Sequence, residues 1–248
     1  MSKADEYRET LRTLEDWDSF LLKESGLPGP RGNLELAQAV ADEGGEELFE
    51  RYLSFDPGKA PVNSPHEFLA FCGVVGLGRL LAEGKMEVLK TLRPYASDPR
   101  WRIREGVAMA LQRLGQVDMD SLLPEMEEWG RGNLLEKRAA AAALCEPNLL
   151  REEKHIQKVL QLLDGITASI QRVEDRKNDK FKALRKGLGY CWSVAVVALP
   201  EEGKKKMERW FSSNDQDVLW IMRENLRKKR LTRMDAEWVE KCKARLGM

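Results

Sequence analysis

The sequence predicts an all-α protein, and three observations carry this prediction. Apolar residues recur at helical spacing, as at Ile103, Val107, Ala110, Leu111 and Leu114, which places them along one face of a helix. No window shows the sustained alternation of apolar and polar residues that a half-buried strand requires. Helix-start signals precede the periodic segments, and the breaks between segments are short runs of Gly, Pro, Asn and Asp.

The expected helices follow one another along the whole chain. Ser64 precedes Pro65 at the first helical position, and Asn133, Asp179 and Asp215 are expected N-caps of their helices. The expected helical segments are 3–24, 33–43, 45–54, 65–83, 85–96, 99–115, 120–130, 134–145, 150–176, 180–199, 201–213, 215–231 and 234–246.

Three of these segments have a pattern that predicts their place in the fold. The glycines of 73–78 lie within a helical pattern, so we expect another helix to approach closely there. Segment 180–199 is apolar nearly all round from Leu188 onward, which predicts a central helix covered on both sides. Segment 234–246 has one apolar face and a charged back, which predicts a C-terminal capping helix.

Four segments align as internal repeats on a basic residue. Arg104, Lys137, Arg185 and Arg223 each open a similar stretch, and successive members are 33, 48 and 38 residues apart. Small residues follow Arg104 and Lys137, and small side chains let the helices of adjacent repeats approach closely. Repeats of about this length indicate stacked helix pairs, and the longest interval carries extra residues near 164–180.

The best of these repeats resembles the second helix of a HEAT repeat. It has Asp98 with Pro99, then Arg104 one turn in, then a run of small residues ending at Leu111. The resemblance covers roughly residues 65–231. It implies an α-α superhelix of about five helix pairs, with a C-terminal cap. We expect residues 1–32 to form an N-terminal helix and a Pro/Gly-rich loop, and residues 33–248 to form a single continuous HEAT-like domain.

Two motifs also resemble the bacterial HEAT-like DNA glycosylases that remove alkylated purines. They are Ser-Asp-x-x-Trp-x-x-Arg at 97–104 and Lys-Gly-Leu-Gly-Tyr at 186–190, where that family tends to carry Trp instead of Tyr190. The family's catalytic carboxylate and Trp-rich turn lie on the preceding helix. The matching residues 68–81 contain neither a carboxylate nor a Trp. The resemblance implies a DNA-repair glycosylase or a catalytically silent relative that still binds DNA.

Composition narrows the class of protein. Of 248 residues, 33% are charged, and no apolar run approaches the roughly 20 residues that span a bilayer. The first residues are polar and resemble no signal peptide. The four cysteines are far apart, with no pair at metal-ligand spacing. We therefore expect a cytoplasmic protein without membrane contact, with reduced and mostly buried thiols.

The neutral total charge conceals an asymmetry. Residues 1–150 carry 18 Lys and Arg against 26 Asp and Glu, whereas residues 151–248 carry 23 against 15. This split indicates either a basic binding region or two halves that attract each other.

If the second helices of successive repeats stack along the concave face, they would align cations and aromatic residues in one groove. The expected inner helices are 99–115, 134–145, 180–199 and 215–231. Such a strip could follow phosphates, although Arg104 and Arg185 could instead bridge to the Asp of a neighbouring repeat. Trp101, between two arginines, could stack on a ligand, whereas Trp192 is expected in the core. The candidate groove residues are Arg100, Trp101, Arg102, Arg104, Arg138, Lys182, Arg185, Lys186, Tyr190 and Arg223.

The loop 25–33 is a second candidate site. Its prolines and glycines fix a tight path that ends at Asn33, the expected N-cap of the next helix, and Arg31 stands beside it. Backbone N–H groups at a helix start attract anions, so a phosphate or carboxylate could dock at Arg31 and Asn33. The alternative is a rigid turn that only joins the N-terminal helix to the stack.

The sequence predicts no metal site, no cofactor and no particular catalytic residue. His66 and His155 have no His partner one turn away, and no nucleophile motif is present. Carboxylates such as Asp98 and Glu105 could act as acid or base in a cleft, but nothing selects one. We expect a non-catalytic binding or scaffold protein that holds a protein segment or nucleic acid in its concave groove. The alternative is a DNA-repair protein of the glycosylase type.

Overall fold

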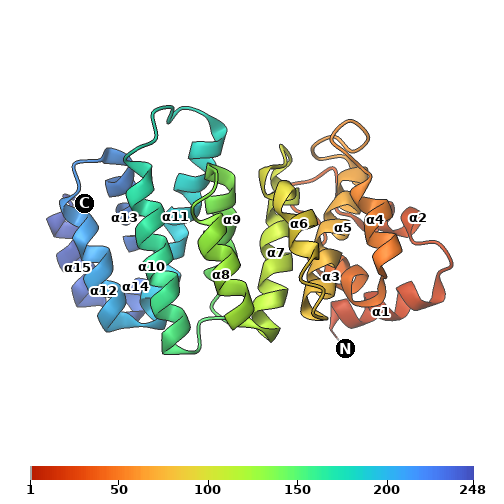
Figure 1. Ribbon diagram of the computed structural model, residues 1–248, viewed down its shortest axis with the longest axis horizontal. Helices are drawn as coiled ribbons and strands as arrows, with labels where there is room; N and C mark the ends of the chain where they lie inside the picture. Colours follow the sequence, from red (N-terminus) through yellow and green to blue (C-terminus); the bar gives the residue numbers. More distant parts are fainter. Residues whose placement is uncertain (1) are drawn as a thin grey trace. The chain divides into compact units, whose positions relative to one another are not determined.

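A computed structural model describes residues 2–248 and confirms the all-α prediction. Every regular element in this part of the chain is a helix, fifteen of them α-helices and two short 3₁₀-helices, and none is a strand (Figure 1). Asn133 and Asp215 cap their helices as predicted, and Ser64 accepts the N–H of Glu67. The prediction for Asp179 is wrong, because Asn178 caps that helix instead.

The chain divides into two compact units, Met1–Val117 and Asp118–Met248. Helix α1 packs on α3, so the expected N-terminal extension lies inside the first unit. Whether residues 33–248 form one continuous domain stays a prediction. The helices of the first unit are α1 (Lys3–Thr13), α2 (Asp18–Glu24), α3 (Leu34–Glu43), α4 (Glu46–Leu53), α5 (Pro65–Ala82), α6 (Val88–Leu92), η1 (Arg93–Ser97) and α7 (Trp101–Val117).

The helices of the second unit are α8 (Met119–Trp129), α9 (Leu134–Leu144), α10 (Glu153–Ile170), α11 (Asp179–Ala198), α12 (Pro200–Glu208), η2 (Arg209–Ser212), α13 (Gln216–Leu226), α14 (Lys229–Met234) and α15 (Ala236–Arg245). Two expected segments are broken. Segment 3–24 divides into α1 and α2, where the Trp17 indole N–H donates to the carbonyl oxygen of Leu11 and closes the end of α1. Segment 215–231 divides into α13 and α14.

Helix α5 is the centre of the first unit and packs against α3, α4 and α7. The predicted close approach at its glycines is confirmed. A Cβ at Gly78 would lie 2.5 Å from the Cα of Ala110 on α7, and one at Gly76 would lie 2.3 Å from the ring of Phe49. Gly78 therefore lets α5 and α7 pack backbone against backbone, and Gly76 leaves room for the Phe49 ring of α4, because any larger residue would separate the helices.

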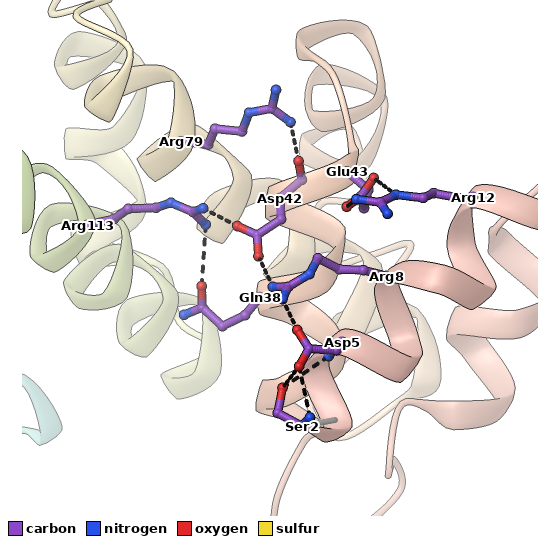
Figure 2. Close-up of polar contacts among 9 residues, drawn as sticks. All are labelled: Ser2, Asp5, Arg8, Arg12, Gln38, Asp42, Glu43, Arg79 and Arg113. Carbon is purple, nitrogen blue, oxygen red and sulfur yellow. Dashed lines mark hydrogen bonds and ion pairs between the residues drawn. The ribbon is translucent and has the colours of Figure 1, made fainter.

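An ion-pair network also holds the first unit together (Figure 2). The Asp42 carboxylate on α3 accepts from Arg8 on α1 at 2.8 Å and from Arg113 on α7. Arg79 on α5 donates to the backbone carbonyl oxygens of Asp42 and Gly44. Four helices thus meet at the end of α3, where unpaired carbonyl groups need donors.

In the second unit, helices pack in two rows. Helix α11 lies between α9 and α13, and α10 contacts both α8 and α12. As predicted, α11 is covered on both sides, and Trp192 is fully buried. The buried Asn225 amide on α13 joins the two helices, because it accepts the N–H of Ser193 at 2.8 Å and donates to the carbonyl oxygen of Leu188 at 2.8 Å.

The four cysteines are free thiols and all are buried, as the sequence predicts. Burial raises the pKa of Cys72 and of Cys145 well above the ordinary thiol value. Both groups therefore stay protonated at neutral pH.

Candidate functional site

Arg100 in the first unit is a structural residue rather than a ligand contact, which corrects the sequence prediction. Its side chain is only 2% exposed. The guanidinium forms two bonds to the Asp98 carboxylate, 2.8 Å and 2.9 Å long, and donates to the backbone carbonyl oxygen of Phe55 at 2.8 Å. All of these bonds are made inside the unit, so Arg100 fixes the start of α7 against the turn after α4.

Arg102 is buried in the same way and is also corrected. It lies 3.2 Å from the fully buried Glu67 carboxylate on α5 and donates to the carbonyl oxygen of Gly29 at 2.6 Å. Glu67 in turn accepts the backbone N–H of Asn63 at 2.6 Å. The pair therefore fastens the Pro/Gly-rich loop to α5 and α7.

At the predicted anion site of loop 25–33, Asn33 and Arg31 have different roles. Asn33 caps α3 by accepting the N–H of Leu36, and its amide donates to Tyr7 and to the carbonyl oxygen of Glu24, both at 2.9 Å. This is the rigid-turn alternative. Arg31 is exposed and lines a cavity of about 330 Å³ together with Trp101 and Glu105.

Trp101 is the aromatic residue of the predicted set that stays accessible in the first unit. It is 43% exposed, and the guanidinium of Arg102 lies 4.5 Å from its ring centroid. Arg104, one turn along α7, donates to the carbonyl oxygens of Asp98 and Pro99 at 2.6 Å and 3.0 Å. Arg104 thus closes the turn that begins α7.

In the second unit, Arg185 and Arg223 bind neighbouring helices. Arg185 on α11 pairs with Asp217 on α13, and its guanidinium lies 4.5 Å from the ring centroid of Trp220. This contact to an Asp on the next helix is the structural alternative for Arg185. Arg223 donates to the carbonyl oxygen of Leu246 at 3.0 Å and so holds the end of the chain.

An ion pair with Arg176 contributes to a lowered pKa of Asp215 at the start of α13. Arg176 bonds the Asp215 carboxylate at 2.7 Å, and Asp215 also accepts two backbone N–H groups as N-cap. Burial raises the pKa of Asp215, but the Arg176 bond and the N–H groups of Val218 and Asp217 outweigh it. The pKa therefore lies below its ordinary value.

The remaining predicted cations lie at or near the surface of the second unit. Lys182 and Lys186 are exposed on α11, with Lys182 paired to Asp179 at 3.0 Å, and Arg138 is half-buried on α9. Tyr190 is 43% exposed. Its hydroxyl accepts from Arg230 at 2.5 Å, and the Arg230 guanidinium lies 4.5 Å from the Tyr190 ring centroid.

Arg230 belongs to a cavity of about 710 Å³ in the second unit, which we call the cationic cavity. The apolar part of its lining comes from the segment between α9 and α10 and from α11, and the charged part comes from the α13–α14 turn and α14. Among residues 2–248, the side chains that line it include no carboxylate. The lining residues are Pro147, Leu150, Val194, Val197, Ala198, Arg227, Lys228, Lys229, Arg230 and Arg233.

The local sequence explains this arrangement. Helix α13 ends at Leu226 and α14 starts at Lys229, so Arg227 and Lys228 occupy the turn, and Lys229 and Arg230 begin α14. Leu231 is fully buried and anchors α14, which leaves Lys229 and Arg233 exposed. Val197, on the facing part of α11, is 37% exposed. Val197 thus stays accessible beside a concentration of positive charge, whereas Leu150 and Val194 are buried.

None of the ten candidate groove residues lines the cationic cavity, although Tyr190 contacts its lining residue Arg230. The signal for its charged part was the run Arg-Lys-Lys-Arg at 227–230. The apolar part comes from residues up to about 80 positions earlier, and no local pattern links those residues to this run.

Within the described residues, no group of three or more His, Cys, Asp or Glu side chains is arranged to hold a metal ion. None of the described helices has both the length and the apolar character needed to cross a membrane.

Comparisons with known proteins do not assign the chain to a family. No protein-family model matches it, and no curated protein matches it significantly. A solved structure described as an engineered protein of the Northeast Structural Genomics Consortium is 14% identical, with a TM-score of 0.33, and the match covers 94% of this chain and 98% of that one. A second engineered protein from the same consortium is 15% identical, with a TM-score of 0.34, over 92% of this chain and 58% of that chain. At these scores neither similarity carries an argument about fold or function.

Proposed function

We propose that the protein is a non-catalytic binding protein whose cationic cavity holds an acidic protein segment with an apolar side chain. The observation that carries this proposal is the combination of five cations, a lining without a carboxylate among the described residues and the exposed Val197 side chain in one cavity. Arg227 already pairs with Glu224 on α13, but the other four like charges repel each other, and an acidic ligand would relieve that repulsion. An apolar side chain of the ligand would cover Val197 and Leu150.

The aliphatic wall favours a protein segment over nucleic acid. Single-stranded nucleic acids are held largely by stacking on aromatic rings. Here Val194, Val197 and Leu150 form the apolar wall, and the nearby Tyr190 ring already contacts Arg230. Burying one Leu side chain contributes about 1.5–3 kcal/mol, and each exposed ion pair adds roughly 0–1 kcal/mol. These contributions sum to roughly 1.5–8 kcal/mol before the cost of association, so we expect weak affinity, with a Kd above about 1 μM.

We also infer that the second unit is built from HEAT-like repeats. The pairs α8/α9, α10/α11 and α12/α13 would then be successive repeats, with α9, α11 and α13 as the inner row. The neighbour relations of α11 with α9 and α13, and of α10 with α8 and α12, support this inference. It places the cationic cavity at the end of the inner row, where α14 follows α13.

The test uses fluorescence anisotropy with the full chain and a labelled peptide of about twelve residues, Asp and Glu around a central Leu-Phe pair. We expect saturable binding that weakens with salt, and no binding of the same peptide with Lys in place of the acidic residues. Lys229→Glu and Val197→Asp should each reduce affinity by about tenfold or more.

The matched control is Lys205→Glu, which reverses an exposed charge on α12 outside the cavity. It should leave binding unchanged. Equal loss in Lys205→Glu and Lys229→Glu would mean that total charge alone drives binding, and the proposal would fail. Tighter binding of an oligothymidylate than of the acidic peptide would instead support the nucleic-acid alternative.

A second function, base release by a glycosylase-type reaction, has one observation in its favour. Trp101 and Glu105 are one helical turn apart on α7, and both line the cavity of about 330 Å³ in the first unit. An alkylated purine is cationic, so a Trp ring could hold it and a carboxylate could stabilise the positive sugar left behind. Base release from alkylated duplex DNA that disappears in Glu105→Gln would establish this function. Salt-sensitive DNA binding without release would instead favour the silent relative.

A further inference from the structure

The second unit has another cavity, of about 470 Å³, which we call the α8–α10 cavity. Residues from the end of α8, from α9 and from one face of α10 surround it. Its lining residues are Glu127, Gly130, Arg131, Lys137, Lys158, Gln161, Leu162, Gly165, Ile166, Ser169 and Arg172. None of them lines the cationic cavity.

Four cations from different segments meet at this cavity. Arg131 follows α8, Lys137 lies in the second turn of α9, Lys158 is on α10, and Arg172 follows α10. Glu127 is the one carboxylate of the lining, so the net charge of the lining is positive. Across residues 2–248, no ion pair engages any of these four cations.

The charged form of Lys137 is destabilised because no carboxylate of the described residues pairs with it. Its side chain is half-buried, and burial lowers the pKa of its ammonium group. A partly buried cation without a carboxylate is destabilised, and a bound anion would remove that penalty.

Gly165 is an independent observation about the same space. It lies in the middle of α10 with an ordinary helical backbone, and a Cβ added there would meet no atom within 4 Å. Glycine is the least favourable helix residue apart from proline. Neither a turn nor a close helix contact requires it here, in contrast to Gly78. Its effect is to leave the cavity open beside Gln161 and Ser169.

We propose that the α8–α10 cavity binds a small molecule that carries two or more phosphoryl groups. Arg131 and Arg172 can each contact phosphoryl oxygens through two parallel N–H bonds, and Lys137 and Lys158 supply point charges between them. Gln161 adds a neutral donor and acceptor, and Leu162 and Ile166 form an apolar wall for the rest of the ligand. A volume of about 470 Å³ is in the range of small-molecule sites. This site is independent of the proposed function of the cationic cavity.

The experiment is isothermal titration calorimetry of the full chain at low salt, with inorganic tripolyphosphate and with ATP as separate probes. We expect one site per chain for at least one probe. Lys137→Glu should weaken binding tenfold or more, since it places a carboxylate beside Glu127. Gly165→Leu should block binding while a circular-dichroism melt shows a fold at least as stable, because leucine favours the helix and meets open space.

Lys205→Glu on α12 is the charge-matched control, and it should leave tripolyphosphate binding unchanged because it lies outside both cavities. The proposal is overturned if neither probe binds, or if Lys205→Glu weakens binding as much as Lys137→Glu. It is also overturned if Gly165→Leu binds the probe as tightly as the natural chain does. Tighter binding of an oligothymidylate than of ATP would overturn it too, because the occupant would then be a nucleic-acid backbone.

Discussion

In the first unit, Arg100 and Arg102 are buried against the carboxylates of Asp98 and Glu67, whereas in the second unit Lys229 and Arg233 face a cavity lined by no carboxylate among the described residues. Composition hardly separates the two units. Residues 1–117 contain 15 Lys and Arg against 19 Asp and Glu, and residues 118–248 contain 26 against 22. The difference lies in what each cation contacts. Arg100 and Arg102 hold elements of the first unit together, whereas Lys229 and Arg233 of the cationic cavity remain available to a ligand.

We expect the largest decrease in the free energy of unfolding when a buried ion pair of the first unit is lost. Arg100→Met would leave the buried Asp98 carboxylate unpaired, and breaking such a pair costs about 3–5 kcal/mol. Urea unfolding should show that decrease in the free energy of unfolding. The control Arg31→Met, at an exposed arginine, should change it by roughly 0.5 kcal/mol or less. Similar values for both variants would refute the structural role of Arg100.

Substitution of one glycine in each unit tests how closely the helices pack around it. Gly78→Ala should destabilise the protein by about 1–3 kcal/mol, because the new Cβ would lie 2.5 Å from Ala110 and would push α5 away from α7. Gly165→Ala in the second unit should instead stabilise by up to about 1 kcal/mol, since nothing is nearby. Thermal melts of the two variants measure both effects. Stabilisation by Gly78→Ala would contradict the close approach of α5 and α7.

Acid should weaken the second unit through Asp215. Its folded-state pKa is lower than the ordinary value, so the stability that it contributes is complete above about pH 4 and is lost as pH falls further through the folded pKa. In urea unfolding at pH 5 and at pH 2.5, Asp215→Asn should lose less stability than the natural chain does, because asparagine caps the helix without titrating. An identical pH dependence in the two proteins would remove Asp215 from this account.

The smallest effect on stability is expected in the cationic cavity. Lys229→Glu and Arg233→Glu replace exposed charges and should change the free energy of unfolding by roughly 0.5 kcal/mol or less. A stabilisation is equally compatible, since both variants reduce repulsion among like charges. A loss comparable to that of Arg100→Met, measured in the same urea series, would show that these cations are structural too, and the contrast between the units would disappear.

The sequence was sufficient for the features that depend on local pattern. Helix class, the caps at Asn133 and Asp215, the close approach at Gly78 and the burial of Trp192 all follow from residues near each other in the chain. The burial of Arg102 could not be predicted, because its partner Glu67 lies 35 residues earlier on another helix. The sequence alone does not distinguish a cation that faces a carboxylate from one that faces water.

The cavities illustrate the same limit. The charged run at 227–230 is visible in the sequence, but the apolar wall that it meets comes from Leu150 and Val197 on other elements. The α8–α10 cavity has no comparable run, since Arg131, Lys137 and Arg172 are scattered along the chain. Gly165 offers a weak local signal, a glycine within a helical pattern, which sequence reasoning alone interprets as a packing contact.

The most direct test of the central claim is nuclear magnetic resonance of the protein with ¹³C-labelled Val and Leu methyl groups, titrated with the acidic Leu-Phe peptide. If the cationic cavity is the binding site, the methyl signals of Val194, Val197 and Leu150 shift in a saturable manner, and the shifts disappear in Lys229→Glu but persist in Lys205→Glu. If the peptide binds while these three residues keep their signals unchanged, the cavity is not the site and the account is contradicted.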